Sequence, residues 1–394
     1  MDVDPAPPPR FTRALQALLV VAFLAGIVTP GVSLLLDPES QAAREAILRE
    51  TRKPAQAPEL PRDLASLDAF PARFEAWFND FMGQRATLIR WHNALKLLVF
   101  GVSPSDTVLL GRDGWMFYNH PESIAEYRGL RPFSEAELDA WQAALEQRAS
   151  WLAARNCRYL FVVGPSKHTI YPEKMVDAQT QLTATRRLDQ LLERLRTRSK
   201  VATLDLRPAL LAAKSDALLY YPHGTHWNPL GGYYAYAAIM SAFAKDDPRF
   251  APKPIEAFRL REQNGLADSW ARKLHLGDLV THEYTTVYYT GPNKAALVEA
   301  PHLSRYWEAY TTTADGSGGQ LRGMLWRDSF GDNIRKLLAL NFSRFTVGVN
   351  GRCPPEELAM AVMREQPQVL IDELVERALL DPPPEPLPGN PRAR

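Results

Sequence analysis

The chain has 394 residues, of which 46% are hydrophobic and 10% aromatic, a composition typical of globular proteins and not of disordered ones. Its 46 basic side chains balance 45 acidic ones, so no excess of positive charge points to nucleic acid as a partner. A chain of this length can bury one large hydrophobic core or two smaller ones.

Near the N-terminus, an apolar run without charge extends from Leu15 to Leu36. A helix of about 22 residues spans a bilayer core of about 30 Å. Arg10 and Arg13 precede the run, so the positive-inside rule predicts a cytoplasmic N-terminus and a periplasmic remainder. A cleaved signal peptide is the alternative. The length of the run and the lack of an obvious cleavage site favour a single-pass inner-membrane anchor.

Composition divides the chain into four predicted parts. They are residues 1–37 (cytoplasmic N-terminus and anchor), 38–74 (stalk), 75–380 (globular domain) and 381–394 (disordered proline-rich tail). Residues 251–320 interrupt the pattern of the globular domain and are interpreted as an insertion, with a β-rich run from Tyr284 to Tyr289 inside it.

Strand and helix patterns alternate along the globular domain. Ser134 and Glu137 form a capping box before one helix, and Pro229 suits the first turn of another. The predicted strands are Tyr159–Val163, Val201–Leu206, Gly323–Trp326, Phe345–Val349 and Val369–Leu374, and the further helices are Leu188–Leu195, Phe330–Leu340 and Pro354–Arg364. This alternation predicts an α/β fold, with a mostly parallel sheet covered by helices on both faces.

Two cysteines, Cys157 and Cys353, would lie in an oxidising compartment on this reading. A disulfide and two unpaired thiols are equally compatible with the sequence, because separation along the chain says nothing about distance in space.

One serine stands where a predicted strand passes into a predicted helix. Such a position places Ser329 at the carboxyl edge of a parallel sheet, where ligands bind in open α/β folds. Backbone N–H groups at the start of the helix would also stabilise a developing oxyanion. The alternative is that Asp328 and Ser329 only cap the helix.

A histidine lies in an earlier turn, between Tyr220 and Pro229. His226 is flanked there by aromatic residues and is a candidate general base near neutral pH. It could instead cap the following helix, or bind a metal together with His223. No third ligand stands at a recognisable spacing, so no metal is expected.

Two further segments stand out. Gly111 to Tyr118 reads as a hairpin, since Asp-Gly is a favoured tight turn. The loop from Gly164 to Thr169 follows a buried strand and should lie at the same sheet edge as Ser329. The candidates for substrate binding are Lys167, His168, Trp227 and Arg327.

Together these segments resemble the alginate O-acetyltransferase family (AlgJ/AlgX-like, with an SGNH-hydrolase-like domain). The resemblance covers roughly residues 75–380. It is carried by Gly111–Tyr118, by Pro165-Ser166-Lys167-His168 with Tyr171-Pro172-Glu173, by Thr225-His226-Trp227-Asn228-Pro229, by Asp328-Ser329-Phe330 and by Glu373–Arg377. In that family the histidine segment precedes the serine, as His226 precedes Ser329 here.

The resemblance implies an acyl-transfer mechanism in the biosynthesis of an exported polysaccharide. His226 would take the proton of Ser329, the serine would form an acetyl ester, and a polysaccharide hydroxyl would then receive the acetyl group. A separate membrane-embedded protein would supply the acetyl group, since nothing in the chain resembles a coenzyme A site. No cofactor is implied.

The chain departs from the family pattern at one position. The family places an aspartate two residues before the histidine, and this chain has Gly224 there. Loss of such an orienting acid costs about 10⁴-fold in turnover in the serine-protease triad. Asp205 and Asp328 are candidate replacements. A weaker dyad, a non-catalytic polysaccharide-binding or assembly protein, and an acetylesterase using the same pair remain as alternatives.

Overall fold

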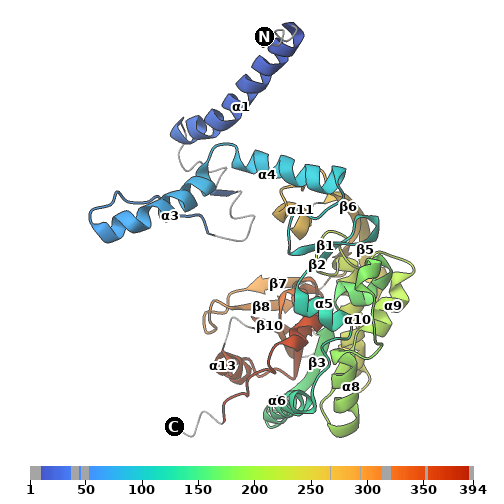
Figure 1. The fold of residues 1–394 in the computed structure, drawn as a ribbon. Coiled ribbons are helices and arrows are strands. Elements are labelled where there is room, and N and C mark those ends of the chain that lie inside the picture. The colour runs from blue at the N-terminus through green and yellow to red at the C-terminus, as the bar shows by residue number, and fades with distance from the viewer. Residues whose placement is uncertain are drawn as a thin grey trace, which may run out of the picture. The chain divides into compact units, whose positions relative to one another are not determined.

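The computed structural model describes residues 10–36, 44–45, 53–266, 268–292, 294–312, 321–350 and 354–389 (Figure 1). The chain forms two compact units. The first comprises residues up to 105 together with residues 270–279, and the second comprises residues 106–269 and 280–394.

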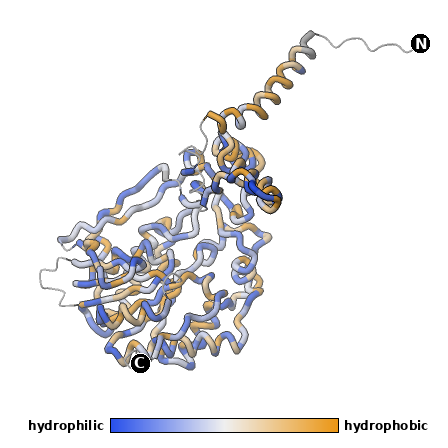
Figure 2. Tube along the Cα trace, turned by 90° about the vertical axis from the view of Figure 1, so that its left-hand side faces the viewer, coloured by the Kyte–Doolittle hydropathy of each residue, from blue (hydrophilic) through white to orange (hydrophobic). Residues whose placement is uncertain are grey.

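The first unit is helical. Its helices are α1 (Arg10–Leu36), α3 (Leu64–Phe81), α4 (Arg85–Ala94), the π-helix η1 (Leu95–Val99) and most of α11 (Ser269–Lys273). The stretch Ala14–Leu36 has a mean hydropathy of 2.4 and is long and apolar enough to cross a membrane, a test that a signal sequence also passes. Figure 2 shows this helix coloured as hydrophobic over most of its length. The predicted boundary between stalk and globular domain, at residue 74, falls inside α3.

The second unit is built on a sheet of seven strands. In spatial order these are β4 (Thr203–Asp205), β3 (Arg158–Gly164), β11 (Val369–Val375), β9 (Arg322–Arg327), β10 (Arg344–Val349), β8 (Trp307–Thr312) and β7 (Ala295–Val298). The first five run parallel, and β8 and β7 extend the sheet in antiparallel fashion. The predicted mostly parallel sheet is therefore confirmed.

Helices cover both faces of this sheet. One face packs against α9 (Arg207–Lys214), α10 (Pro229–Ala244) and α12 (Arg335–Ala339), and the other against α6 (Glu135–Ala153), α8 (Arg187–Arg198) and α13 (Pro355–Glu365). Along β3, Leu160 and Val162 join the first core, while Phe161 and Val163 join the second. Because both faces are buried, the strand reads as a continuous apolar run.

The local signals for helix starts and turns are confirmed. Ser134 accepts the backbone N–H of Glu137 and so caps α6. Asn228 caps α10 in the same way, with Pro229 in the first turn. β1 (Val108–Leu110) and β2 (Met116–Tyr118) form the predicted hairpin. Asp113 and Gly114 in its turn have φ angles of 55° and 76°, and Asp-Gly is favoured there because both residues tolerate positive φ.

The structure corrects the interpretation of residues 251–320 as an insertion. β7 and β8 are members of the central sheet, and only β5 (Phe258–Leu266) and β6 (His282–Tyr289) form a separate hairpin. The predicted helix Phe330–Leu340 is also shorter than expected, since a 3₁₀ turn over Ser329–Asn333 precedes α12.

The proline-rich tail is ordered on α6 as far as residue 389. Leu387 is 2% exposed, and its N–H and C=O both bond to the side chain of Gln147. Trp151 also donates to the carbonyl of Pro388. The prediction of a disordered tail is wrong for these residues, because backbone hydrogen bonds and one buried leucine fix them.

Cys157 is a buried free thiol in the structure, and burial raises its pKa to about 12. Cys353 lies outside the described residues. A buried thiol that stays protonated is unreactive, so Cys157 belongs to the core.

Candidate active site

Three neighbouring parallel strands end at one edge of the sheet. β3, β11 and β9 lie side by side, and the chain continues from them into Lys167, Arg377 and Ser329 respectively. Carboxyl ends of parallel strands are the usual place for ligand binding in an open α/β fold. The predicted position of Ser329 at this edge is therefore the one that the structure shows.

The structure brings Ser329 and His226 together. The His226 Nε2 atom lies 2.9 Å from the Ser329 Oγ atom, so the imidazole can accept the hydroxyl proton. Two further hydrogen bonds join the segment that contains His226 to the segment that contains Ser329. Trp227 Nε1 donates to the Phe330 carbonyl at 3.0 Å, and Asn333 Nδ2 donates to the Trp227 carbonyl at 2.7 Å. The pair is thus held by the backbone on both sides.

Neither predicted orienting acid is hydrogen-bonded to this histidine. Asp328 uses one carboxylate oxygen to accept the Phe330 N–H and the other to accept the Val375 N–H, each at 2.7 Å. Asp205 accepts the guanidinium of Arg207 through both oxygens. Both carboxylates are therefore engaged elsewhere, and the two assignments as orienting acid are corrected.

The second nitrogen of His226 faces a hydroxyl. Its Nδ1 atom lies 3.0 Å from the Thr225 Oγ1 atom. Burial lowers the pKa of His226, and the charge of Arg377 lowers it further, whereas Asp268, Asp328 and Asp332 act in the opposite direction. The imidazole is therefore neutral at neutral pH, which is the state that a general base requires.

A carboxylate from a distant segment occupies the space beside Gly224. A Cβ atom added at Gly224 would lie 1.7 Å from the Asp268 Oδ2 atom. Asp268 is buried, and its Oδ1 atom accepts the N–H of Ser269 at 2.5 Å. Within the described part of the chain, its Oδ2 atom has no hydrogen-bond partner. The place of a side chain at position 224 is thus taken by the acid of residue 268.

Lys167 is a structural residue and not a free substrate ligand. Its side chain is buried, and its Nζ atom lies within hydrogen-bond distance of four backbone carbonyls, which share its three N–H groups. These belong to Met116 at 2.5 Å, Tyr221 at 3.0 Å, Pro222 at 2.8 Å and Gly224 at 2.6 Å. The ammonium therefore holds the hairpin against the turn that carries His226.

The other predicted substrate contacts are buried as well. His168 packs against the Tyr127 ring, and burial lowers its pKa to about 3. Trp227 is fully buried, and the guanidinium of Arg327 bonds to Asp332 and to the carbonyl of Asp328. The edge-of-sheet argument predicted where these residues lie but not that they are buried, and their burial argues against the predicted contact with substrate.

Replacing Lys167 by methionine is expected to lower the free energy of unfolding by about 2–4 kcal/mol, because several buried carbonyls lose their donor. Thermal unfolding followed by circular dichroism measures the change. Lys174→Met is the control, since Lys174 forms a partly exposed ion pair with Asp113 whose loss should cost less than about 1 kcal/mol. Equal effects of the two substitutions would contradict the role of Lys167.

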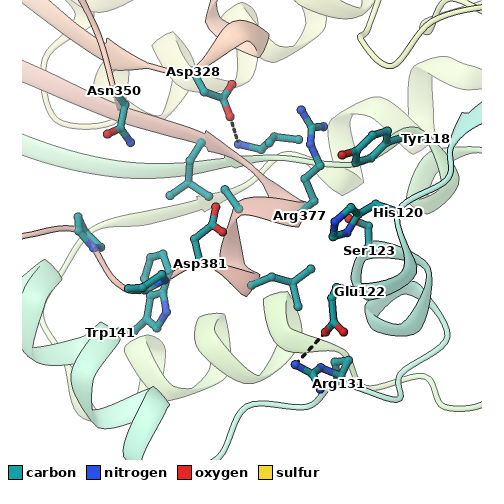
Figure 3. Close-up of a pocket in the computed structure, with 16 residues that line it drawn as sticks. Tyr118, His120, Glu122, Ser123, Arg131, Trp141, Asp328, Asn350, Arg377 and Asp381 are labelled. Carbon is teal, nitrogen blue, oxygen red and sulfur yellow. Dashed lines mark hydrogen bonds and ion pairs between the residues drawn. The ribbon is translucent and has the colours of Figure 1, made fainter. Parts of the chain in front are cut away.

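A cavity of about 720 Å³ lies next to Asp328 and Arg377, which follow the ends of β9 and β11 (Figure 3). Its lining includes Asp328, Arg377, Tyr118, His120 and Trp141. The rings of Tyr118 and His120 stack 5.7 Å apart, and the Arg377 guanidinium lies 5.8 Å from the centre of the Tyr118 ring. Aromatic faces with a few polar groups are typical of sites for organic ligands.

Arg377 connects this cavity to the reactive pair. Its guanidinium lies 5.7 Å from the centre of the Phe330 ring, and its charge lowers the pKa of His226. The sequence marked Arg377 only as the end of a motif segment. Thr225 was part of a motif segment but was given no role. Asp268 was not predicted at all, because it belongs to a segment remote from His226 in the sequence.

The pH dependence of the reaction should depend on the positive charge of Arg377, because this charge lowers the pKa of His226. A base must be neutral to accept a proton, so kcat/KM is expected to fall as pH decreases through the lowered pKa of His226, below its ordinary 6.5. Arg377→Gln removes a cause of that lowering and should move the acid limb to higher pH. Arg377→Lys retains the charge and should leave the limb in place. A limb that does not move in Arg377→Gln would contradict the coupling.

His223 does not join His226 in a metal site. Its ring packs edge-on against His282 at 5.2 Å, and burial lowers its pKa to about 4. Among the residues that the structure describes, no group of three histidine, cysteine, aspartate or glutamate side chains is arranged to hold a metal ion.

Comparisons with known proteins agree with this picture. Residues 108–282 match the family described as the SGNH hydrolase-like domain of acetyltransferase AlgX, which confirms the resemblance predicted from the motifs. No curated protein matches the chain.

Two solved structures with low identity share the fold, those of PatB1 and of a DHHW family protein. PatB1 of Bacillus cereus, solved with a sulfonyl adduct, has 12% identity and a TM-score of 0.51, over 69% of this chain and 97% of that chain. A DHHW family protein from Eubacterium siraeum has 12% identity and a TM-score of 0.50, over 70% and 92%. The O-acetyltransferase domain of Pseudomonas putida AlgJ has 18% identity and a TM-score of 0.44, over 73% and 95%.

Proposed function

We propose that the chain, whose residues 108–282 match the SGNH hydrolase-like domain of acetyltransferase AlgX, transfers acetyl groups to a polysaccharide through Ser329. The observation that carries the proposal is the 2.9 Å hydrogen bond between Ser329 Oγ and His226 Nε2. A nucleophile and a base within hydrogen-bond reach form the basic unit of acyl transfer. This arrangement favours catalysis over a polysaccharide-binding role on the same fold.

The proposed reaction has two halves. In the first, His226 takes the proton of Ser329 while the serine oxygen attacks the carbonyl carbon of an acetyl donor, and the departing group then receives that proton. In the second, a sugar hydroxyl gives its proton to His226 and attacks the acetyl-serine. The bond between the acetyl carbon and the Ser329 oxygen breaks, His226 returns the proton to that oxygen, and the sugar ester is released. We assign the oxyanion to the backbone N–H of Ser329, since the Phe330 N–H already donates to Asp328.

We assign Asp268 as a positioning residue for His226. The Nδ1–H of the neutral imidazole donates to the Thr225 hydroxyl, and Thr225 directly follows Gly224, against which the Asp268 carboxylate lies. In this scheme the carboxylate and the hydroxyl together hold the ring and stabilise the imidazolium that forms in each half-reaction. The acid at residue 268 thus takes over the role that the family gives to the aspartate two residues before the histidine.

We place the acceptor in the cavity that Asp328 and Arg377 line. The rings of Tyr118 and His120 offer faces for a sugar, and Arg377 supplies positive charge close to the reactive pair. The acetyl group comes from a membrane-embedded donor protein, and the chain acts in the periplasm, anchored to the inner membrane through residues 15–36. The apolar span Ala14–Leu36 supports that location.

Transfer and hydrolysis differ in the fate of the acetyl group. An acetylesterase would use the same pair with water in place of the sugar. The test starts with the intact mass of the purified full chain in detergent after exposure to 4-nitrophenyl acetate. We expect a gain of about 42 Da, one acetyl group replacing a hydrogen. Addition of oligosaccharides should remove the adduct and give acetylated sugar. Release of free acetate alone, at an unchanged rate, would favour the esterase.

An aryl sulfonyl fluoride provides an independent titration of the nucleophile. The structure of PatB1, which shares this fold, contains a sulfonyl adduct. We expect one sulfonyl group per chain, attached at Ser329 and located by peptide mass mapping. A chain that reacts with neither reagent would count against catalysis and favour the polysaccharide-binding alternative.

A further inference from the structure

Helix α4 and the π-helix η1 that continues it present an apolar face to solvent. The large exposed side chains recur at helical spacing and are Leu88, Trp91, Leu95, Leu98, Val99, Phe100 and Val102. Trp91 is 63% exposed and Val99 69%. On the opposite side of α4, Asn93 and Ala94 are buried in the first unit, and Asn93 Nδ2 donates to the carbonyl of Leu274. A helix with this division between its faces is amphipathic, but with the apolar face left uncovered.

The charges of this segment all have one sign. Between residues 82 and 105 the sequence contains Arg85, Arg90 and Lys96 but no aspartate or glutamate. Arg90 pairs with Asp278 on the inner side. Apolar and tryptophan side chains on one face, with arginine and lysine at its flanks, are typical of helices that lie in the interface of an anionic membrane.

The start of α4 is attached to the end of the apolar helix α1. The Gly83 N–H donates to the carbonyl of Pro30 at 3.0 Å, and Phe81 packs with Leu34 in a small buried cluster. A Cβ atom at Gly83 would lie 2.0 Å from the Cβ atom of Ser33, so only glycine permits this approach. The turn between α3 and α4 therefore lies at the C-terminal end of the span Ala14–Leu36.

We propose that α4 and η1 lie in the outer interface of the membrane that α1 crosses, with the apolar face in contact with lipid. The occupant of this face is lipid because the face adjoins the end of a membrane span and carries basic residues without acids. Arg85 and Lys96 then lie at the level of the lipid phosphates, and Trp91 lies at the boundary with the acyl chains. The inference rests on the proposed anchor and is independent of the proposed chemistry.

Fluorescence quenching in lipid nanodiscs tests the proposal with the full chain. In a background with Cys157 and Cys353 replaced by alanine, single cysteines are introduced by Leu98→Cys, Leu24→Cys and Leu182→Cys and labelled with the polarity-sensitive dye NBD. Leu24 lies in the apolar helix, and Leu182 is an exposed leucine of the second unit. The nanodiscs contain phosphatidylethanolamine and phosphatidylglycerol, with or without a lipid that carries a nitroxide near the head of its acyl chain.

We expect the dye at position 98 to emit at shorter wavelength and to lose most of its emission to the nitroxide lipid, while the dye at position 182 is quenched only by aqueous iodide. If the dye at position 24 responds to the nitroxide but the dye at position 98 does not, the anchor stands and this proposal is overturned. A dye at position 98 that both quenchers fail to reach would mean that protein covers the face, which also overturns it. If the nitroxide lipid does not quench the dye at position 24, the proposed membrane anchor is contradicted, and the interfacial position of α4 with it. The acetyl assays test the chemistry separately.

Discussion

Ser329→Ala is expected to abolish the acetyl adduct and to lower acetyl transfer by at least about 10³-fold, because the hydroxyl that carries the acyl group is removed. His226→Ala should have a similar effect, since its Nε2 atom is the acceptor for the serine proton. The two losses should not add in the double variant, because the residues act as one unit. Intact mass measures the adduct, and release of 4-nitrophenolate measures the rate.

Ser123→Ala serves as the matched control for Ser329→Ala. Ser123 lines the cavity next to Asp328 and lies on α5 (Pro121–Tyr127), and none of the hydrogen bonds between described residues joins it to His226. It should retain the adduct and nearly all of the activity. An adduct that persists in Ser329→Ala, with the same mass and stoichiometry, would show that another residue carries the acetyl group.

Most helices and strands of the second unit could be predicted from short local sequence patterns. Capping at Ser134, the proline after Asn228 and the apolar run of β3 each act over a few residues, and each appears where it is expected. The edge strand β7 was harder to recognise. Only the first and last residues of β7 are partly buried, and the strand pairs on one side only, with β8. Edge strands carry a weak apolar signal because one side lacks a neighbour.

The reactive pair could be predicted, whereas its surroundings could not. Ser329 and His226 stand at a strand end and before a helix, and both positions have local signatures. The acid beside Gly224 comes from a segment with no motif, and only the folded chain brings it there. For Lys167 the prediction of its position was right, but the prediction that its side chain contacts substrate was not supported. Its position at the sheet edge is visible in the sequence, but the four carbonyls that draw its side chain inward are not.

Asp268→Ala is expected to lower turnover by about 10²–10⁴-fold while leaving the acyl-accepting serine in place. The reason is that His226 loses the carboxylate that stabilises its protonated form. The single variant Gly224→Asp should also have a lower turnover, because its Cβ atom would meet the Asp268 carboxylate and two acids would share one buried space. In the double variant Gly224→Asp/Asp268→Ala, the new aspartate has that space to itself. The turnover of the double variant should be at least about tenfold higher than that of Asp268→Ala.

Only an acid acting on the histidine would be rescued in this way. A purely structural Asp268 would leave the double variant no more active than the weaker single variant. The pH profile gives a second criterion. Asp268 raises the pKa of His226, so the acid limb of kcat/KM should shift to lower pH in Asp268→Ala and return in the double variant. Asp205→Ala is the control, since its carboxylate pairs with Arg207 and should leave the limb unmoved. Full activity in Asp268→Ala would mean that Thr225 alone holds the ring and that the pair works without an acid.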